Sequence, residues 1–230
     1  MIAQEIQVWR RTLRQQLIER RSALSRATLD AYRRCIDAHL QRAFPDLDRG
    51  VIAFCWPYKN EYDARHLLAA LRRRGATTAL PAIIAPKTAL VFREWHPGIA
   101  LEAGPLGIPF PPDSAEVRPD SVLLPVVGFD AAGYRLGYGG GYFDRTLAAM
   151  PRPRVIAVAY EFMLIETIHP QPHDIPVDYV VTERGVYVRR ENGGLRFSEV
   201  PAPACSSPPC RAAQLTANCF GKTPEGKPGR

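Results

Sequence analysis

Long hydrophobic runs are missing from this sequence. No window of about eighteen residues is apolar throughout, as a membrane-spanning helix would require. The first residues also lack a basic segment followed by an apolar one, which is the pattern of a secretory signal. From these absences we expect a cytoplasmic protein with no membrane partner.

Cysteine is scarce and irregularly spaced. Five cysteines occur in 230 residues, and no two of them form a C-x-x-C pair. Cys35 and Cys55 stand in a helix-like and a strand-like segment, where we expect small buried hydrophobic residues. The other three, Cys205, Cys210 and Cys219, stand close to the C-terminus. A disulfide framework is not expected, and the spacing argues against a zinc site.

Acidic residues are outnumbered, mainly near the N-terminus. The chain carries a formal net charge of +7, and residues 1–42 hold nine arginines against four acids. Such an excess can indicate binding of nucleic acid. The arginines fall between apolar residues at helical spacing, however, and an exposed helix face is the simpler explanation. We therefore expect no nucleic-acid partner.

The two common phosphate-binding fingerprints are absent as well. The chain has neither G-x-x-x-x-G-K-[ST] nor a G-x-G-x-x-G that follows a strand and precedes an acidic residue by about twenty positions. Present instead are residues 128–145 (GFDAAGYRLGYGGGYFDR), with six glycines, two arginines and two aspartates around aromatic residues. Glycines leave backbone N–H groups exposed and allow positive φ, as a phosphate cradle requires. Polyphosphate binding is our first hypothesis.

The flanks of this segment favour the same hypothesis. Residues 121–127 have the pattern of a buried strand, and residues 142–150 that of a helix. A strand, a glycine loop and a helix start in this order direct amides and the positive helix end at an anion. Arg135 and Arg145 can pair with phosphate, and Asp144 is placed to hold a Mg²⁺ that bridges phosphate oxygens. The alternative is a flexible hairpin of glycines and tyrosines, which the charges of both signs disfavour.

Helical and strand-like segments alternate along the chain. Helices are expected at residues 4–21, from Ser25 as an N-cap, at 61–74 closed by Gly75, and at 142–150. Strands are expected at residues 51–55, 77–80, 89–92, 121–127, 155–159, 179–182 and 186–188. This order predicts an α/β fold, a layered α/β/α domain with a mainly parallel sheet, over residues 1–197. Residues 198–230 are rich in proline and poor in apolar residues, and we expect a disordered tail there.

The segment from Arg135 to Arg145 closely resembles the signature of the 5-formyltetrahydrofolate cyclo-ligase (5,10-methenyltetrahydrofolate synthetase) family. Further resemblances follow in order over residues 9–188. RRTLR at residues 10–14 is similar to the family's K-x-x-L-R, with arginine in place of lysine, and EYD at 61–63 resembles E-[IV]-[DE]. EAGPLGIP at residues 102–109 resembles the family's G-x-x-G-I-x-x-P stretch, and HDIPVD at 173–178 with Thr182 and Glu183 resembles its closing block.

The resemblance implies a fold of the NagB/RpiA/CoA transferase type and a reaction that depends on ATP and Mg²⁺. In that reaction 5-formyltetrahydrofolate becomes 5,10-methenyltetrahydrofolate, and ADP and phosphate are released. The γ-phosphoryl group activates the formyl oxygen, and N10 then closes the ring. The implied substrates are a folate and ATP, and we expect a monomer.

The resemblance also implies roles for individual residues. The ATP site would comprise Arg10, Arg14, Arg135, Gly137, Tyr138, Gly139, Gly140, Gly141, Tyr142 and Asp144. The catalytic residues would be Tyr142, beside the formyl group, and Arg135. Folate would contact Trp56, Glu61 and Tyr142, and Mg²⁺ would be held by Asp144 and Asp174. Because relatives can carry basic residues at the positions of Tyr138 and Gly140, we expect Arg10 and Arg14 to complete the phosphate site.

Simpler interpretations stay open for each of these residues. Arg10 and Arg14 could be solvated helix arginines, and Asp144 and Asp174 could be turn or cap residues. Tyr142 and Trp56 could be core aromatics, and Glu61 could be an acid in the first turn of a helix. For the whole chain, one alternative is another α/β enzyme that binds a nucleotide or a sugar phosphate. The last alternative is a basic nucleic-acid-binding protein.

Overall fold

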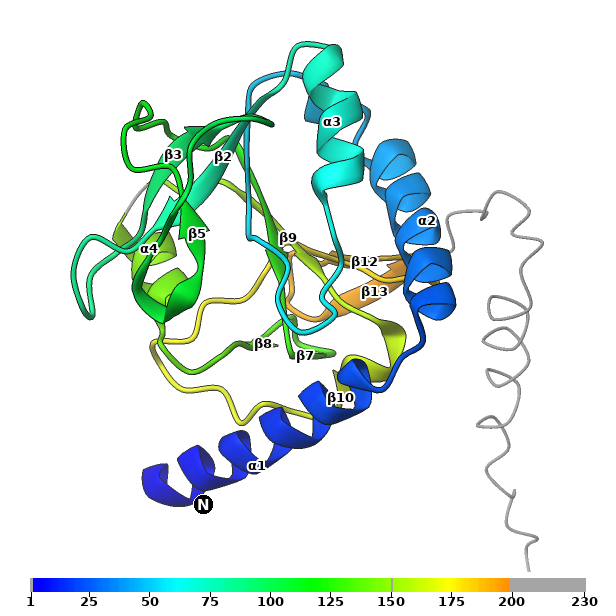
Figure 1. Ribbon diagram of the computed structural model, residues 1–230. Coiled ribbons are helices and arrows are strands. Elements are labelled where there is room, and N and C mark those ends of the chain that lie inside the picture. Colours follow the sequence, from blue (N-terminus) through cyan, green and yellow to red (C-terminus); the bar gives the residue numbers. More distant parts are fainter. Residues whose placement is uncertain (1, 150, 199–230) are drawn as a thin grey trace, which may run out of the picture.

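An eight-stranded sheet forms the centre of the protein, in the strand order β13-β12-β11-β9-β6-β1-β2-β3 (Figure 1). The computed structural model describes residues 2–149 and 151–198. The strands of this sheet are β1 (Val51–Phe54), β2 (Thr77–Ala82), β3 (Val91–Trp95), β6 (Ser121–Pro125), β9 (Arg154–Val158), β11 (Tyr179–Val181), β12 (Val186–Arg189) and β13 (Leu195–Ser198). From β2 to β11 all neighbours are parallel, while β3, β12 and β13 are added antiparallel. The predicted mainly parallel α/β sheet is confirmed.

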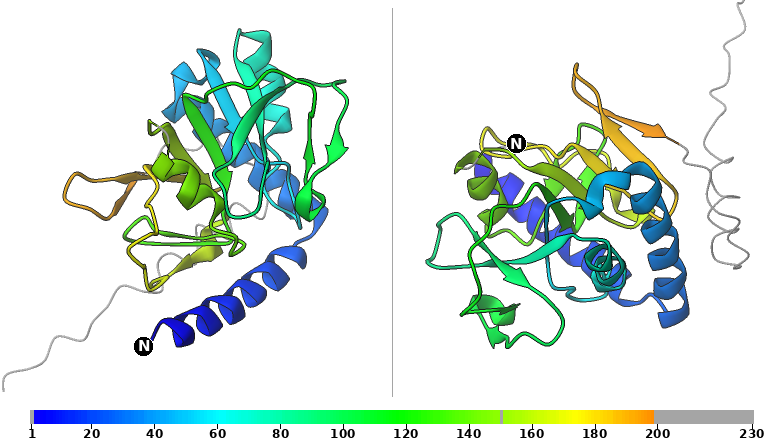
Figure 2. Two further views of the ribbon diagram at one scale, coloured as in Figure 1. Left: turned by 90° about the vertical axis from the view of Figure 1, so that its left-hand side faces the viewer. Right: turned by 90° about the horizontal axis from the view of Figure 1, so that it is seen from above.

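Helices lie on both sides of the sheet. They are α1 (Ala3–Ser22), α2 (Arg26–Ala43), α3 (Arg65–Arg73) and α4 (Tyr142–Ala149), with short 3₁₀ turns at Pro45–Asp48, Pro105–Gly107 and Glu161–Met163. In Figure 1, α2 and α3 lie on one side of the sheet and α4 on the other, while α1 passes along one edge, as the left view of Figure 2 also shows. Ser25 caps α2, because its Oγ accepts a hydrogen bond from Thr28 N at 3.1 Å. Within the described ranges, none of the helices has the length and apolar character needed to cross a bilayer.

The central strands supply most of the core. β1, β6 and β9 are nearly continuous apolar runs, as expected of strands that are covered on both faces. Ile52, Leu123 and Ile156 are at most 1% exposed, and Leu40 of α2 and Leu68 of α3 pack into the same cluster. This rigid core fixes the positions of the loops that leave the strand ends.

The loop between β1 and α3 is longer than predicted. We expected a helix from Glu61, but α3 begins at Arg65. Lys59 and Asn60 both have positive φ, at 47° and 60°, so the chain before Glu61 turns in a way that a helix cannot continue. Glu61 N donates to Tyr58 O and closes this turn. Glu61 is therefore a loop residue, and its interpretation as an acid in the first turn of a helix is wrong.

The segment between β6 and α4 was predicted to be a single glycine loop, and this prediction is wrong. It contains a hairpin of β7 (Gly128–Asp130) and β8 (Arg135–Leu136), which joins β10 (Leu164–Ile165) in a small second sheet. Asp130 shapes the turn, since its Oδ1 accepts hydrogen bonds from Ala132 N and Tyr134 N at 3.0 Å each. The glycine loop proper is residues 137–141.

A few smaller elements and residues also differ from the prediction. A short antiparallel pair, β4 (Glu102–Ala103) and β5 (Pro109–Phe110), lies in a segment for which no strand was predicted. β13 was not predicted, and it takes Ser198 into the sheet. The predicted disorder of the remaining tail, with its three cysteines, lies outside the described residues. Cys35 is buried as predicted, whereas Cys55 is half-buried.

Candidate active site

The polar loops of the protein gather at one edge of the parallel sheet. The segments that follow β1, β6, β9 and β11 all leave from the carboxyl ends of their strands, which is where open α/β sheets bind ligands. The predicted site residues, apart from those in α1, come from these segments. α1 passes beneath this edge and contacts three of the four loops.

α1 presents a stripe of three arginines to the loops. Arg10, Arg14 and Arg21 are spaced by four and seven residues, which places them on one face of the helix. Leu17 lies between them and packs on the small second sheet. Arg10 and Arg14, the two arginines that the resemblance assigns to the ATP site, therefore lie on the same face. Arg21 was missed, although the same helical spacing includes it.

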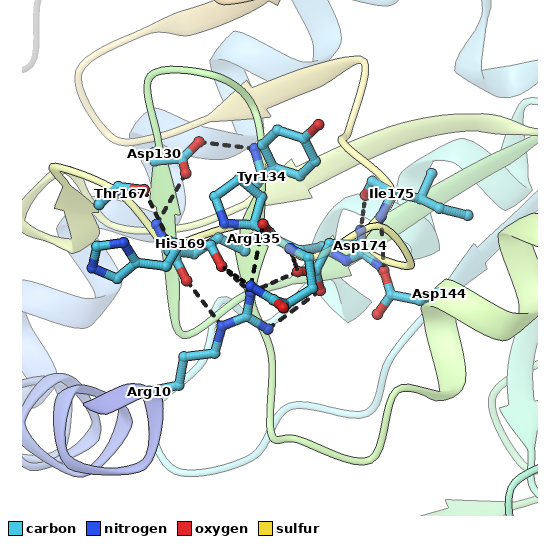
Figure 3. A network of polar contacts seen from close by, with 12 residues as sticks. Arg10, Asp130, Tyr134, Arg135, Asp144, Thr167, His169, Asp174 and Ile175 are labelled. Atoms are coloured by element: carbon cyan, nitrogen blue, oxygen red, sulfur yellow. Dashed lines mark hydrogen bonds and ion pairs between the residues drawn. The ribbon is translucent and has the colours of Figure 1, made fainter. Parts of the chain in front are cut away.

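Arg10 ties α1 to the loop after β9 (Figure 3). Its Nε donates to Ile168 O at 2.9 Å, its Nη2 to His169 O at 2.9 Å, and Nη2 also to Asp174 Oδ2 at 2.6 Å. Burial alone would raise the pKa of Asp174, but the hydrogen bonds from Arg10 and Gln171 N bring this pKa below its ordinary value. In this conformation Arg10 is a clamp between two elements of the protein.

Arg135 and Asp144 form a second pair beside the first. Arg135 Nη2 donates to Asp144 Oδ1 at 2.8 Å, and Arg135 Nη1 donates to Ile175 O. Ile175 N also donates to Asp144 Oδ1, at 3.1 Å, so one peptide segment contacts both side chains. Burial lowers the pKa of Arg135, and Asp144 opposes that shift. Because Ile175 follows Asp174 directly, the two ion pairs form one network (Figure 3).

The two predicted magnesium ligands differ in what they can offer a metal. Both oxygens of Asp174 are taken by Arg10, with Gln171 N as a further donor. In Asp144, Oδ1 is taken and Oδ2 makes no hydrogen bond to another described residue. Residues 2–149 and 151–198 contain no cluster of three or more His, Cys, Asp or Glu that could hold a metal alone. Mg²⁺ often needs only one or two carboxylates when phosphates and water complete its shell. Asp144 therefore fits the role of a magnesium ligand, whereas Asp174 does not as long as Arg10 binds both of its oxygens.

Arg14 borders the glycine loop and keeps free donors. Its Nε donates to Gly137 O at 2.6 Å, and a Cβ added at Gly139 would lie 3.4 Å from its Nη2. Neither Nη atom donates to a residue in the described ranges. Burial lowers the pKa of Arg14, and the neighbouring charges of Arg10 and Arg11 lower it further. The guanidinium is thus a cation in excess at the loop, a state that a bound anion would relieve.

The glycine loop leads a run of unpaired amides into α4. Gly139 and Gly141 have φ of 95° and 64°, which a residue with a side chain adopts only under strain. A Cβ at Gly140 would approach the ring of Tyr142 to 2.8 Å. The backbone N–H groups of residues 138–144 donate no hydrogen bond within the part of the chain that the structure describes. Such a run at a helix start favours an anion.

Glu61, Tyr138 and Arg21 form a third, deeper group. Tyr138 Oη donates to Glu61 Oε1 at 2.7 Å and accepts from Arg21 Nη2 at 2.6 Å, while Arg21 Nη2 lies 3.6 Å from Glu61 Oε1. Glu61 Oε2 accepts from Tyr58 N at 3.0 Å. Burial raises the pKa of Glu61, and Arg21 and the two hydrogen bonds oppose that shift. Arg21 is 1% exposed and also donates to Lys59 O at 2.8 Å.

The two remaining predicted residues lie further apart. Tyr142 is half-buried at the start of α4, the guanidinium of Arg145 lies 5.0 Å from its ring centre, and its hydroxyl is without a partner among the described residues. Trp56 is half-buried. Its ring centre lies 6.1 Å from that of Trp95, and Cζ of Arg65 lies 4.7 Å above its ring. The structure thus brings Glu61 to the glycine loop, and places Trp56 among the aromatic residues beside β3.

The carboxyl edge of the parallel sheet thus carries N–H groups and Arg14 Nη atoms that donate to no described residue, together with the carboxylate of Asp144. Such a set is typical of α/β enzymes that bind phosphorylated ligands. The comparison with protein families is more specific. The 5-formyltetrahydrofolate cyclo-ligase family matches residues 6–183, and this chain belongs to that family. The resemblance drawn from the glycine segment is confirmed.

Curated relatives carry the same name. The 5-formyltetrahydrofolate cyclo-ligase of Escherichia coli (strain K12) is 33% identical over 145 residues, which cover 59% of this chain and 79% of that protein. That of Mycolicibacterium smegmatis (strain ATCC 700084 / mc(2)155) is 35% identical over 137 residues, which cover 56% of this chain and 66% of that protein.

Solved structures agree with the fold. The NMR structure of the Aquifex aeolicus 5,10-methenyltetrahydrofolate synthetase matches with a TM-score of 0.68 and 28% identity, over 84% of this chain and 97% of that one. A 5,10-methenyltetrahydrofolate synthetase from Mycoplasma pneumoniae matches with a TM-score of 0.62 over 76% of this chain and 98% of that one. At 23% identity, this second likeness concerns the fold alone.

Proposed function

We propose that this protein is an ATP-dependent 5-formyltetrahydrofolate cyclo-ligase, which forms 5,10-methenyltetrahydrofolate and releases ADP and phosphate. One combination carries the proposal: the family match over residues 6–183 and, inside it, a glycine loop whose unpaired amides lie beside the free donors of Arg14. A polyphosphate co-substrate is the ligand that such a loop suits best.

In this proposal, the triphosphate of ATP lies on the glycine loop and the start of α4. The N–H groups of residues 138–144 and the two Nη atoms of Arg14 would bind its oxygens. The role of Arg10 is positional, because its guanidinium already binds Asp174 and two carbonyl groups. Arg135, predicted to bind phosphate and to act in catalysis, holds Asp144 in place in the conformation seen here.

A magnesium ion would be held by Asp144 through Oδ2, together with phosphate oxygens and water. When bound, Mg²⁺ neutralises part of the charge that develops on the transferred phosphoryl group. The ion pair with Arg135 and the hydrogen bond from Ile175 N keep the Asp144 carboxylate oriented before any metal arrives.

The folate would bind at Glu61. Its carboxylate is nearly buried and fixed by Tyr58 N, and a carboxylate can accept two adjacent N–H bonds from the amidine edge of a pterin. The exposed ring of Tyr58 lies beside it and offers apolar surface to a flat heterocycle. Trp56 follows β1 in the same loop and would contact the folate from the side of β3.

The reaction then has two steps. The γ-phosphorus of ATP forms a bond to the formyl oxygen while its bond to ADP breaks. N10 attacks the formyl carbon with its lone pair, loses its proton, and phosphate departs as the ring closes. The hydroxyl of Tyr142, which bonds to none of the described residues, would hydrogen-bond the formyl oxygen from the end of the loop. The protein contributes positioning and charge neutralisation.

The test is direct. Purified protein is incubated with 5-formyltetrahydrofolate, ATP and Mg²⁺, and the absorbance of the methenyl product is followed, with parallel samples that lack ATP or Mg²⁺. We expect product only in the complete mixture. Folded protein that forms no product in that mixture would contradict the proposed function.

A further inference from the structure

The glycine loop has one side chain of its own with which to hold on to the rest of the protein, while Arg14 Nε and Arg145 Nη2 donate to its Gly137 O and Gly140 O at 2.6 Å each. Between Gly137 and Gly141 only Tyr138 carries a side chain, and its hydroxyl bridges Glu61 at 2.7 Å and Arg21 at 2.6 Å. These partners belong to the loop after β1 and to α1, so the bridge joins three separate parts of the site. The loop is thereby held in one position.

This fastening is built to be reversible. The hydroxyl of Tyr138 is in a buried group, but the residue as a whole is 45% exposed, and its ring contacts another exposed ring, that of Tyr58, at 5.8 Å. Glycines stand on both sides of Tyr138, and a Cβ added at Gly137 would meet nothing within 4 Å. Because the flanking glycines leave the backbone unrestricted and nearly half of Tyr138 is already exposed, its side chain can turn away from Glu61 toward solvent.

The bridge also occupies the carboxylate that the proposed function assigns to folate. Glu61 Oε2 is taken by Tyr58 N, and Oε1 is taken by Tyr138 Oη. Each carboxylate oxygen can accept two hydrogen bonds, but Glu61 is only 8% exposed, so a ring that brings two adjacent N–H groups to it competes with the Tyr138 hydroxyl for the approach to Oε1. Arg21 remains to balance the charge of Glu61 when the tyrosine leaves.

We propose that Tyr138 is a displaceable latch: its hydroxyl holds the place of the folate on Glu61, and folate binding releases the glycine loop to close on ATP. The inference rests on the proposed function and adds an order to it. Folate and ATP then bind with positive coupling, which by thermodynamic linkage is equal in both directions. Tyr138 is a positioning residue in this scheme and does not touch the reacting atoms.

The experiment compares wild type with Tyr138→Phe, which keeps the ring and removes the hydroxyl. Calorimetric titration with 5-formyltetrahydrofolate alone gives the folate affinity. Titration with a non-hydrolysable ATP analogue and Mg²⁺, with and without folate, gives the coupling. Tyr179→Phe is the matched control, because Tyr179 begins β11 at the opposite edge of the sheet.

For Tyr138→Phe we expect folate to bind roughly tenfold more tightly, a change of about 1.4 kcal/mol, near the lower end of what a hydrogen bond to a charged group contributes. The coupling between folate and the ATP analogue should disappear in this variant and stay intact in Tyr179→Phe. Weaker folate binding by Tyr138→Phe would show that the hydroxyl is a substrate contact, which contradicts the proposal. An unchanged folate affinity together with unchanged coupling would also contradict it. Wild-type protein that neither binds nor converts folate would instead refute the proposed function.

Discussion

Replacing Arg21 by methionine should destabilise the protein strongly. The guanidinium is 1% exposed and donates to Lys59 O, Tyr58 O and the Tyr138 hydroxyl. Arg21→Met leaves these acceptors unpaired and removes the buried counter-charge of Glu61. Breaking a buried ion pair from one side costs about 3–5 kcal/mol, and we expect the free energy of unfolding to fall by roughly that amount.

The loss should grow with pH. Burial raises the pKa of Glu61 above its ordinary value of 4.5, and Arg21 opposes that shift, so the pKa rises further in Arg21→Met. A carboxyl group with a raised pKa in the folded state stabilises the protein fully below its unfolded pKa and loses that contribution as pH rises through the folded pKa. The variant should therefore be closer to wild type at about pH 5 than at about pH 8.

Urea unfolding followed by tryptophan fluorescence measures this effect at both pH values. Arg11→Met is the matched control, since Arg11 lies in the same helix with an exposed side chain, and it should change the free energy of unfolding by no more than about 0.5 kcal/mol. A loss below about 1 kcal/mol in Arg21→Met, or an equal loss at both pH values, would show that Arg21 does not stabilise the charged form of Glu61 in this way.

Three further outcomes are expected. Arg14→Gln should raise the KM for ATP about tenfold or more, because a charged hydrogen bond contributes about 1.5–3 kcal/mol; Arg11→Gln should not, and equal KM values in the two variants would count against the phosphate role of Arg14. Asp144→Ala should abolish turnover and retain cooperative unfolding, and near-normal turnover would remove Asp144 from the metal site. Burial raises the pKa of Glu183 to about 7, so wild type should lose up to about 3 kcal/mol of stability between about pH 4.5 and pH 7. Glu183→Gln should flatten that decline in urea unfolding, and an unchanged slope would show that Glu183 is not its source.

Most of the fold could be predicted because its elements repeat a pattern. The apolar spacing of residues 4–21 and the cap at Ser25 gave the first two helices. The buried strands are long enough to be recognised as apolar runs, and their alternation with helices gave the parallel sheet.

The errors fall where structure depends on single residues or distant partners. The start of α3 was misplaced because consecutive positive φ values at Lys59 and Asn60 leave no periodic signal. β7 and β8 are too short for a period of two to be visible, and β10, which completes their sheet, comes more than twenty residues later in the chain.

Sequence patterns predicted only those parts of the candidate site that repeat within one element. Arg10 and Arg14 could be placed on one face because a helix repeats every 3.6 residues. The bond between Glu61 and Tyr138 joins residues 77 positions apart, and only the folded sheet brings them together. Arg21 shares the spacing of the other arginines, but nothing local distinguishes a buried arginine from an exposed one.

In the proposed reaction, this chain couples ATP cleavage to closure of the folate ring. The most direct measurement is the amount of ADP formed beside the amount of methenyl product in one reaction of wild-type protein with 5-formyltetrahydrofolate, ATP and Mg²⁺. We predict equal amounts of both, and neither when folate or ATP is omitted. Methenyl product that forms without ATP, or ADP that accumulates without methenyl product, would contradict the account.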